Sequence, residues 1–178
     1  LLKQIGEGGF CFVFLATNVE TNETYAIKRV SCADPELLER CRREAGVHRR
    51  LNHANTMPLL GLHIAEQESL CYMAFPFIPR SLRAEINERL FEASTSRPLP
   101  EPKVWLLMHR IVKGLKAVHE IAQVSHRDIK PENILLKDRF HPVLMDFGSA
   151  GVLRQPISTR REILTCIEEA SIHTTVAN

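Results

Sequence analysis

The sequence changes character at two prolines near its middle, Pro76 and Pro79. Before them, runs of apolar, β-branched and aromatic residues separated by polar turns predict strands at 1–5, 12–17, 24–30, 57–64 and 69–75. After them the pattern is mainly helical, apart from two short β-type pieces at 134–136 and 143–145. Strands in the first part and helices in the second predict an α+β fold.

Three helices are expected. Asp34 and Pro35 suit the N-cap and first turn of a helix that runs to about residue 51. A short helix is predicted at 82–91 and a longer one at 103–122. On the longer helix, steps of four and three residues indicate one buried stripe, formed by Val104, Met108, Ile111, Leu115 and Val118. The polar residues 154–178 show no clear periodicity.

Composition excludes several classes of protein. The chain has 178 residues, of which 44% are hydrophobic and 25% charged, as in a soluble globular domain. Its net charge of +2 argues against a nucleic-acid-binding surface. The five cysteines lack Cys-x-x-Cys spacing, which disfavours a disulfide framework or a zinc site and fits a reducing cytosol. No apolar run is long enough to cross a membrane.

Two features of the strand-rich part concern phosphate chemistry. The segment 6–9, Gly-Glu-Gly-Gly, lies between two predicted strands, which favours a flap over phosphates, with a plain hairpin turn as the alternative. Lys28 shares the inward face of the third strand with Ala26 and therefore needs a partner. Glu44, on or beside the apolar face of the next helix, can reach it; two unrelated surface charges are the alternative.

Two motifs of the helical part complete a known set. Residues 126–133 read His-Arg-Asp-Ile-Lys-Pro-Glu-Asn, and Asp-Phe-Gly follows at 146–148. These two motifs follow the glycine flap, Lys28 and Glu44 along the chain, and this order is that of the protein-kinase signature. The chain therefore resembles the eukaryotic protein kinases, in the serine/threonine rather than the tyrosine form. It is most similar to the numb-associated kinase family, in particular to its myristoylated and palmitoylated members.

The resemblance implies a two-lobe fold, with an antiparallel β N-lobe carrying one helix at 1–75, a hinge at 76–80 and a partial, mainly helical C-lobe at 81–178. It implies an ATP- and Mg²⁺-dependent kinase that acts on Ser and Thr of protein substrates, without nucleic acid or a transmembrane segment. It also implies a cytoplasmic protein, peripheral to Golgi or other membranes where a lipidated N-terminus precedes Leu1.

Because the Ala-Pro-Glu motif of the family would follow Asn178, we expect a C-terminally truncated catalytic domain that ends within the activation segment. The alternative is a truncated, catalytically silent nucleotide-binding or interaction module.

The resemblance also assigns roles to residues. Asp128, Lys130 and Asn133 would be catalytic: Asp128 would accept or orient the substrate hydroxyl proton, and Lys130 would contact the transferred phosphate. Asn133 and Asp146 would hold Mg²⁺, and Lys28, paired with Glu44, would bind the α- and β-phosphates. The other nucleotide-binding residues would be Ile5, Gly6, Gly8, Val13, Ala26, Pro76, Ile78 and Leu135.

Further positions of the kinase fold are implied by the same match. Phe75 would be the gatekeeper residue at the back of the nucleotide site, and Arg127 would meet a phosphorylated residue of the activation segment. Four side chains would pack as the regulatory spine, namely Leu59, His48, His126 and Phe147.

Overall fold

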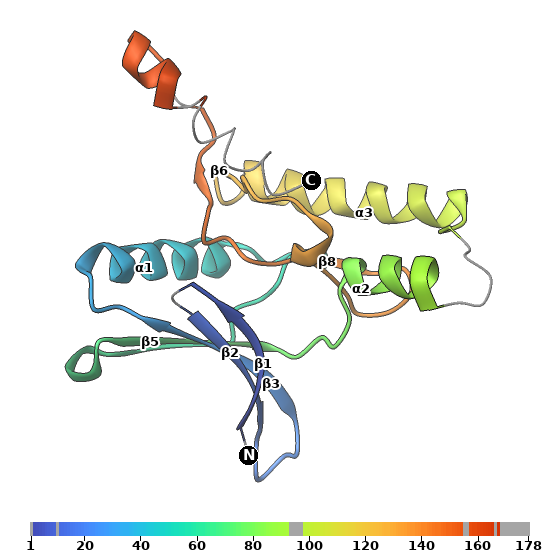
Figure 1. Cartoon of the computed structure of the whole chain (residues 1–178), viewed down its shortest axis with the longest axis horizontal. Helices are drawn as coiled ribbons and strands as arrows, with labels where there is room; N and C mark the ends of the chain where they lie inside the picture. The colour runs from blue at the N-terminus through green and yellow to red at the C-terminus, as the bar shows by residue number, and fades with distance from the viewer. Residues whose placement is uncertain (1, 10, 93–97, 155–156, 166, 168–178) are drawn as a thin grey trace.

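The computed structural model describes residues 2–9, 11–92, 98–154, 157–165 and 167. Its first part is an antiparallel five-stranded sheet, and its second part is mainly helical (Figure 1). The strand order is β1-β2-β3-β5-β4. The strands of this sheet are β1 (Leu2–Gly8), β2 (Cys11–Thr17), β3 (Thr24–Ser31), β4 (Gly61–Ala65) and β5 (Leu70–Pro76).

Helix α1 (Pro35–Arg50) packs on this sheet. It begins as predicted, because the Asp34 side chain accepts a hydrogen bond from the backbone N–H of Glu36 at 2.8 Å. Cys41 and Ala45 point from the helix into a core with Met73 and Phe75 from β5. The helix therefore packs an apolar face against the sheet.

The second part contains helices and two pairs of short strands. Helix α2 (Leu82–Asn87) continues as a π-helical turn (Glu88–Glu92), so the helix predicted at 82–91 changes its hydrogen-bond pattern half-way. Helix α3 (Glu101–Glu120) follows. The small strands pair as β6 (Val124–Ser125) with β9 (Gly151–Val152), and β7 (Ile134–Leu136) with β8 (Pro142–Leu144). Single 3₁₀ turns lie at Glu66–Glu68 and Pro131–Asn133.

The strand predicted at 57–64 is wrong in its first half, since β4 begins at Gly61. The preceding backbone pairs with the second part of the molecule instead. Met57 N–H donates to the Leu144 carbonyl at 2.8 Å, and Leu144 N–H donates to the Asn55 carbonyl at 2.9 Å. Met57 therefore pairs with Leu144, 87 residues further along the chain, and not within the sheet as the apolar pattern suggested.

The buried stripe predicted on α3 is wrong in its first half. Val104 and Met108 are 39% and 49% exposed, and the buried face runs through Leu107, Ile111, Gly114 and Val118. Both sets have the same spacing of four and three residues. Gly114 determines which set is buried, because the backbone of Asn55 lies very close to it. A Cβ added at Gly114 would lie 2.8 Å from the Asn55 carbonyl oxygen.

Residues 160–165 are helical, although no periodicity predicts a helix there. Thr159 and Glu162 form a capping box. Glu162 N–H donates to the Thr159 hydroxyl at 3.3 Å, and the Glu162 carboxylate accepts from the backbone N–H of Thr159 at 2.9 Å. The Thr-x-x-Glu spacing is therefore the sequence feature that could have predicted this helix. Among the residues that the structure describes, no helix combines the length and apolarity needed to span a membrane.

Candidate active site

A cleft of about 320 Å³ lies where the sheet, α1 and the β7–β8 hairpin meet. Nearly all of the residues expected to bind nucleotide line it. They are Ile5, Gly6, Val13, Ala26, Lys28, Glu44, Pro76, Ile78 and Leu135. Asp146 and Phe75 also line the cleft, whereas Gly8 does not.

The strand register accounts for much of this lining. Val13 lies opposite Lys28 in the β2–β3 pair, and Ala26 lies opposite Phe75 in the β3–β5 pair. Alternation along β3 turns Ala26 and Lys28 to the same face, so an apolar and a charged side chain lie next to each other in the cleft.

Six further residues line the cleft. His48 was expected as a spine residue and Cys11 follows the glycine segment, whereas sequence reasoning missed Met57, Phe77, Glu132 and Met145. Three of them have a signal in the sequence, because Phe77 lies within the predicted hinge, Glu132 lies in the His-Arg-Asp motif segment and Met145 precedes Asp146. Met57 has none. It reaches the cleft only because residues 55–57 leave the sheet to pair with β8.

Lys28 is held by two carboxylates. Its Nζ lies 2.7 and 2.9 Å from the two oxygens of Glu44 and 3.3 Å from Oδ1 of Asp146. Burial lowers the pKa of Lys28, but Glu44 and Asp146 outweigh that effect and raise the pKa above its ordinary value. Burial raises the pKa of Asp146, and Lys28 more than reverses this rise. The Lys28 ammonium and the Asp146 carboxylate are therefore charged at neutral pH, whereas burial outweighs Lys28 at Glu44 and raises the pKa of that carboxyl group.

A second polar cluster surrounds Asp128. Its Oδ2 accepts a hydrogen bond from the Asn133 amide at 2.7 Å and lies 2.9 Å from Lys130 Nζ. The Asn133 amide also donates to the Asp128 backbone carbonyl at 2.9 Å. Both side-chain contacts are made to Oδ2 of Asp128, so Oδ1 can accept a hydrogen bond from another donor.

Two residues beside these clusters have a left-handed backbone. Asp146 has a φ of 63° and Arg127 a φ of 65°, a region that costs a non-glycine residue about 1 kcal/mol or more. Such strain persists only where the surroundings enforce it. For Asp146 the enforcing contacts are the ion pair with Lys28 and a hydrogen bond from Gly148 N–H at 3.4 Å.

Three of the four expected spine residues form a continuous buried ring stack. The ring of Phe147 lies 4.8 Å from that of His48 and 5.1 Å from that of His126, and His48 also contacts Phe75 at 4.9 Å. Leu59 is partly buried against the neighbouring core. His126 Nδ1 accepts from Asp128 N–H at 3.3 Å, so its Nε2–H donates to the Met145 carbonyl at 3.1 Å. This histidine therefore links the backbones that carry Asp128 and Asp146.

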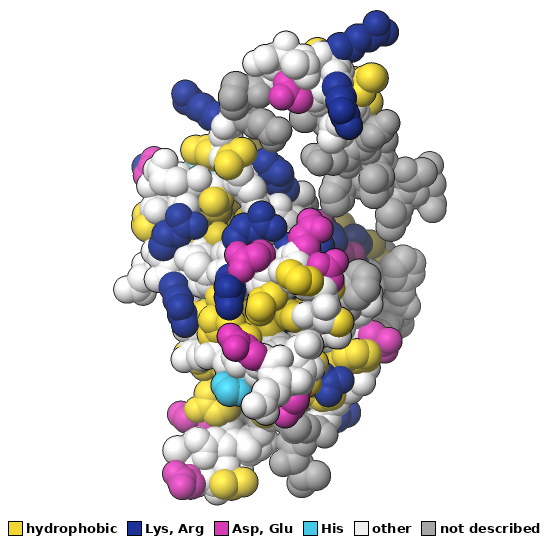
Figure 2. All heavy atoms as spheres, turned by 90° about the vertical axis from the view of Figure 1, so that its left-hand side faces the viewer, with side chains coloured by type: hydrophobic (Ala, Val, Ile, Leu, Met, Phe, Trp, Pro, Cys, Tyr) yellow, Lys and Arg dark blue, Asp and Glu magenta, His cyan; other side chains and the backbone are white. Residues whose placement is uncertain are grey.

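Arg127 lies in a second cavity of about 690 Å³, together with Arg40 and Arg43 of α1 and with Glu44, which also lines the cleft. Figure 2 views the molecule from the α1 side, where Lys and Arg side chains gather over the centre and upper half. Arg127 packs so closely against Gly151 that a Cβ added at Gly151 would collide with the guanidinium group. The Arg127 guanidinium donates to the Ser125 hydroxyl at 3.2 Å and to the Val152 carbonyl at 3.4 Å, and the expected contact with a phosphorylated residue stays a prediction.

The donor set fits a hard cation such as Mg²⁺. The Asn133 amide nitrogen donates its hydrogen bonds to Asp128, so the side-chain oxygen of Asn133 is available to bind a cation. Asp146 adds a carboxylate. Within the described ranges, no three His, Cys, Asp or Glu side chains form a metal cluster. Two protein oxygens suit Mg²⁺ in particular, because this ion usually keeps several waters and binds substrate phosphates as well.

Comparison with known proteins agrees with this geometry. The protein kinase domain family matches residues 1–167. Human serine/threonine-protein kinase 16 is 33% identical over 99% of this chain, and the rat protein of the same name is 32% identical over the same extent. The chain spans 57% of the length of each of these relatives. Serine/threonine-protein kinase TAO3 of Pongo abelii is 34% identical over 85% of the chain and 16% of its own length.

Proposed function

Because the chain belongs to the protein kinase family, we propose that it forms part of the catalytic domain of a protein serine/threonine kinase that uses Mg²⁺ and ATP. Residues 1–75 and 81–178 act as the two lobes, joined by a hinge at 76–80. One observation carries the proposal: the three-way ion pair of Lys28, Glu44 and Asp146 lines the same cleft as the apolar slot.

The apolar end of the cleft suits a purine. Ile5, Val13, Ala26 and Leu135 supply its walls. Pro76 has no N–H and can offer only its carbonyl to the base, while Ile78 can donate its backbone N–H. We assign these two groups to adenine, which carries both a donor and an acceptor on one edge.

The charged end of the cleft suits the phosphates. Lys28, held cationic by Glu44 and Asp146, binds the α- and β-phosphates, and the backbone at Gly6 and Gly8 closes over them. Asn133 and Asp146 hold Mg²⁺, which neutralises charge on the phosphates. Preorganised charges of this kind are the main contribution that a protein makes to phosphoryl transfer.

Asp128 and Lys130 act on the acceptor side of the reaction. Lys130 and Asn133 engage Oδ2 of Asp128, and Oδ1 remains to accept the hydrogen bond of a Ser or Thr hydroxyl. This contact orients the hydroxyl oxygen toward the γ-phosphate and receives its proton. Lys130 contacts the transferred phosphate, so one lysine orients the aspartate and also stabilises the moving charge.

Phosphate transfer by the full-length protein tests the proposal. The protein is incubated with Mg²⁺, radiolabelled ATP and casein, and the labelled amino acids are identified after hydrolysis. We expect phosphoserine or phosphothreonine, and a loss of about 100-fold or more in Asp128→Asn. Asp138→Asn, an exposed aspartate in the β7–β8 turn, is the matched control and keeps the wild-type rate. ATP binding without transfer would contradict the proposal and favour a silent nucleotide-binding module.

We propose a cytoplasmic location for the whole protein, at Golgi or other membranes through a lipidated N-terminal segment. This follows from the family resemblance stated above. Incorporation of a myristate analogue by the full-length protein, together with its recovery in the membrane fraction, is expected. A protein that takes up no lipid label and stays in the soluble fraction would contradict it.

A further inference from the structure

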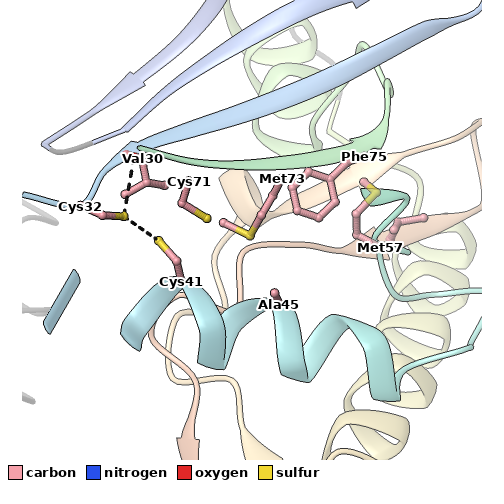
Figure 3. Packing of buried hydrophobic residues seen from close by; sticks show 9 residues of the cluster. Val30, Cys32, Cys41, Ala45, Met57, Cys71, Met73 and Phe75 are labelled. Carbon is pink, nitrogen blue, oxygen red and sulfur yellow. Dashed lines mark hydrogen bonds between the residues drawn. The ribbon is translucent and has the colours of Figure 1, made fainter. Parts of the chain in front are cut away.

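Three cysteine side chains meet where β3, α1 and β5 come together (Figure 3). The sulfurs of Cys32 and Cys41 lie 3.7 Å apart, and the thiol of Cys71 also interacts with that of Cys41. All three side chains are buried. Cys32 follows the last residue of β3, whereas Cys41 lies in the second turn of α1, so the contact joins the sheet to the helix.

Cys32 also borders a cavity of about 300 Å³ between the start of α1 and the β4–β5 turn. Leu38, Ile64 and Leu70 are among its other walls. Neither Cys41 nor Cys71 lines this cavity, so Cys32 alone can meet a small molecule that enters it. Figure 2 views this end of the molecule, where apolar side chains are exposed between acidic and basic ones.

We propose that Cys32 and Cys41 form an oxidation site, at which hydrogen peroxide closes an intramolecular disulfide between the end of β3 and α1. The two sulfurs must approach by about 1.6 Å to reach the S–S bond length. Hydrogen peroxide is small enough to reach Cys32 through the cavity.

The chemistry takes two steps. The Cys32 thiolate attacks one oxygen of the peroxide and becomes a sulfenic acid, while the hydroxide that leaves takes a proton and becomes water. The Cys41 thiolate then attacks the Cys32 sulfur, forms the S–S bond and releases a second hydroxide, which is also protonated. In sum, two thiols and one peroxide give one disulfide and two waters.

The order of the steps follows from the surroundings. Burial is the main cause that raises the pKa of Cys32, to about 11, and the hydrogen bond with Cys71 raises that of Cys41. Both thiols are thus largely protonated at neutral pH, so the reaction with peroxide is slow and proceeds through the small thiolate fraction of Cys32. Access decides which reacts first, and only Cys32 has it.

The disulfide would hold α1 in its observed position. Cys41 precedes Glu44 by three residues, so fixing the helix at Cys41 also fixes the carboxylate that binds Lys28. The oxidised protein would therefore keep the Lys28–Glu44 ion pair. The crosslink also restrains the unfolded chain, which adds to stability.

The test treats the full-length protein with hydrogen peroxide, blocks remaining thiols with N-ethylmaleimide and maps peptides without reduction. We expect a Cys32–Cys41 crosslink and a rise in Tm of roughly 5 °C that dithiothreitol reverses. Cys32→Ala and Cys41→Ala should lose the crosslink and the rise in Tm. Cys11→Ala, at a partly buried cysteine on β2, is the control and should retain both.

Two results would overturn the proposal. One is the absence of a Cys32–Cys41 crosslink at peroxide concentrations that already oxidise Cys11, and the other is a crosslink in which Cys71 replaces Cys32. Peptide mapping of the wild-type protein decides both without any variant. Neither readout uses phosphate transfer, so the outcome is independent of the proposed kinase activity.

Discussion

His48 shows how much one buried side chain can determine. Its Nδ1–H donates to the Met57 carbonyl at 2.8 Å, and its Nε2 has no partner within the part of the chain that the structure describes. Burial lowers its pKa to about 4, whereas an unfolded histidine titrates near 6.5. Between these values the unfolded chain binds more protons than the folded one, so stability is full above pH 6.5 and falls toward pH 4.

We predict that the wild-type protein loses about 2 kcal/mol of unfolding free energy through His48 when the pH falls from 7 to 5. His48→Leu keeps the packing between Phe75 and Phe147 and removes the titrating group. Urea unfolding at the two pH values should therefore show a smaller loss in this variant. His63→Leu, on an exposed position of β4, should behave like the wild type. Equal losses in His48→Leu and wild type would contradict this account.

At the residue scale, the sequence predicts the parts of the site that depend on short spacing. Asp128, Lys130 and Asn133 lie within six residues and meet through a single turn, so their motif nearly determines their contact. Met57 belongs to no motif and enters the cleft through a pairing with β8 that the local pattern could not reveal.

At the scale of elements, α1 and α3 show what periodicity can and cannot predict. The Asp34–Pro35 pair predicts where α1 begins, and Asp34 caps the helix as expected. Helix α3 carries two apolar stripes with the same spacing. Contact with residue 55 and β8 selects the stripe that contains Gly114, because only a glycine lets these backbones approach.

Two glycine substitutions test this explanation. Gly114→Ala places a Cβ 2.8 Å from the Asn55 carbonyl oxygen and 3.0 Å from Leu144 Cδ1, so we expect a loss of about 2 kcal/mol in unfolding free energy. Gly46→Ala, on α1, meets no atom within 4 Å and should stabilise the protein by up to about 1 kcal/mol, since alanine favours helix. Chemical denaturation measures both. A neutral or stabilising Gly114→Ala would show that α3 does not depend on this approach.

At the scale of the whole molecule, Lys28 connects three regions. Its partners come from α1 and from the segment after β8, so one ammonium links the sheet, the helix and the second part of the fold. The motifs predict that these charged residues act together. However, Glu44 and Asp146 lie 16 and 118 residues from Lys28 along the chain, so only the packed fold brings the three side chains into contact.

Removing Lys28 should leave Glu44 buried without its partner. We expect Lys28→Met to lower the unfolding free energy by about 3 kcal/mol. The double variant Lys28→Met/Glu44→Leu should recover a large part of this loss, because it removes the unpaired charge as well. Urea unfolding of both variants gives the coupling between the two residues. Additive losses would mean that the two side chains do not act as a pair.

The most direct test of the account is a titration of the full-length protein with ATP, with and without Mg²⁺, by calorimetry. If Asn133 and Asp146 hold Mg²⁺ against phosphates bound by Lys28, Mg²⁺ should tighten ATP binding about tenfold or more in the wild type. In Asp146→Asn this gain should be largely lost, whereas Asp138→Asn should keep it. ATP binding that does not respond to Mg²⁺, or an unchanged response in Asp146→Asn, would contradict the assignment of the cleft.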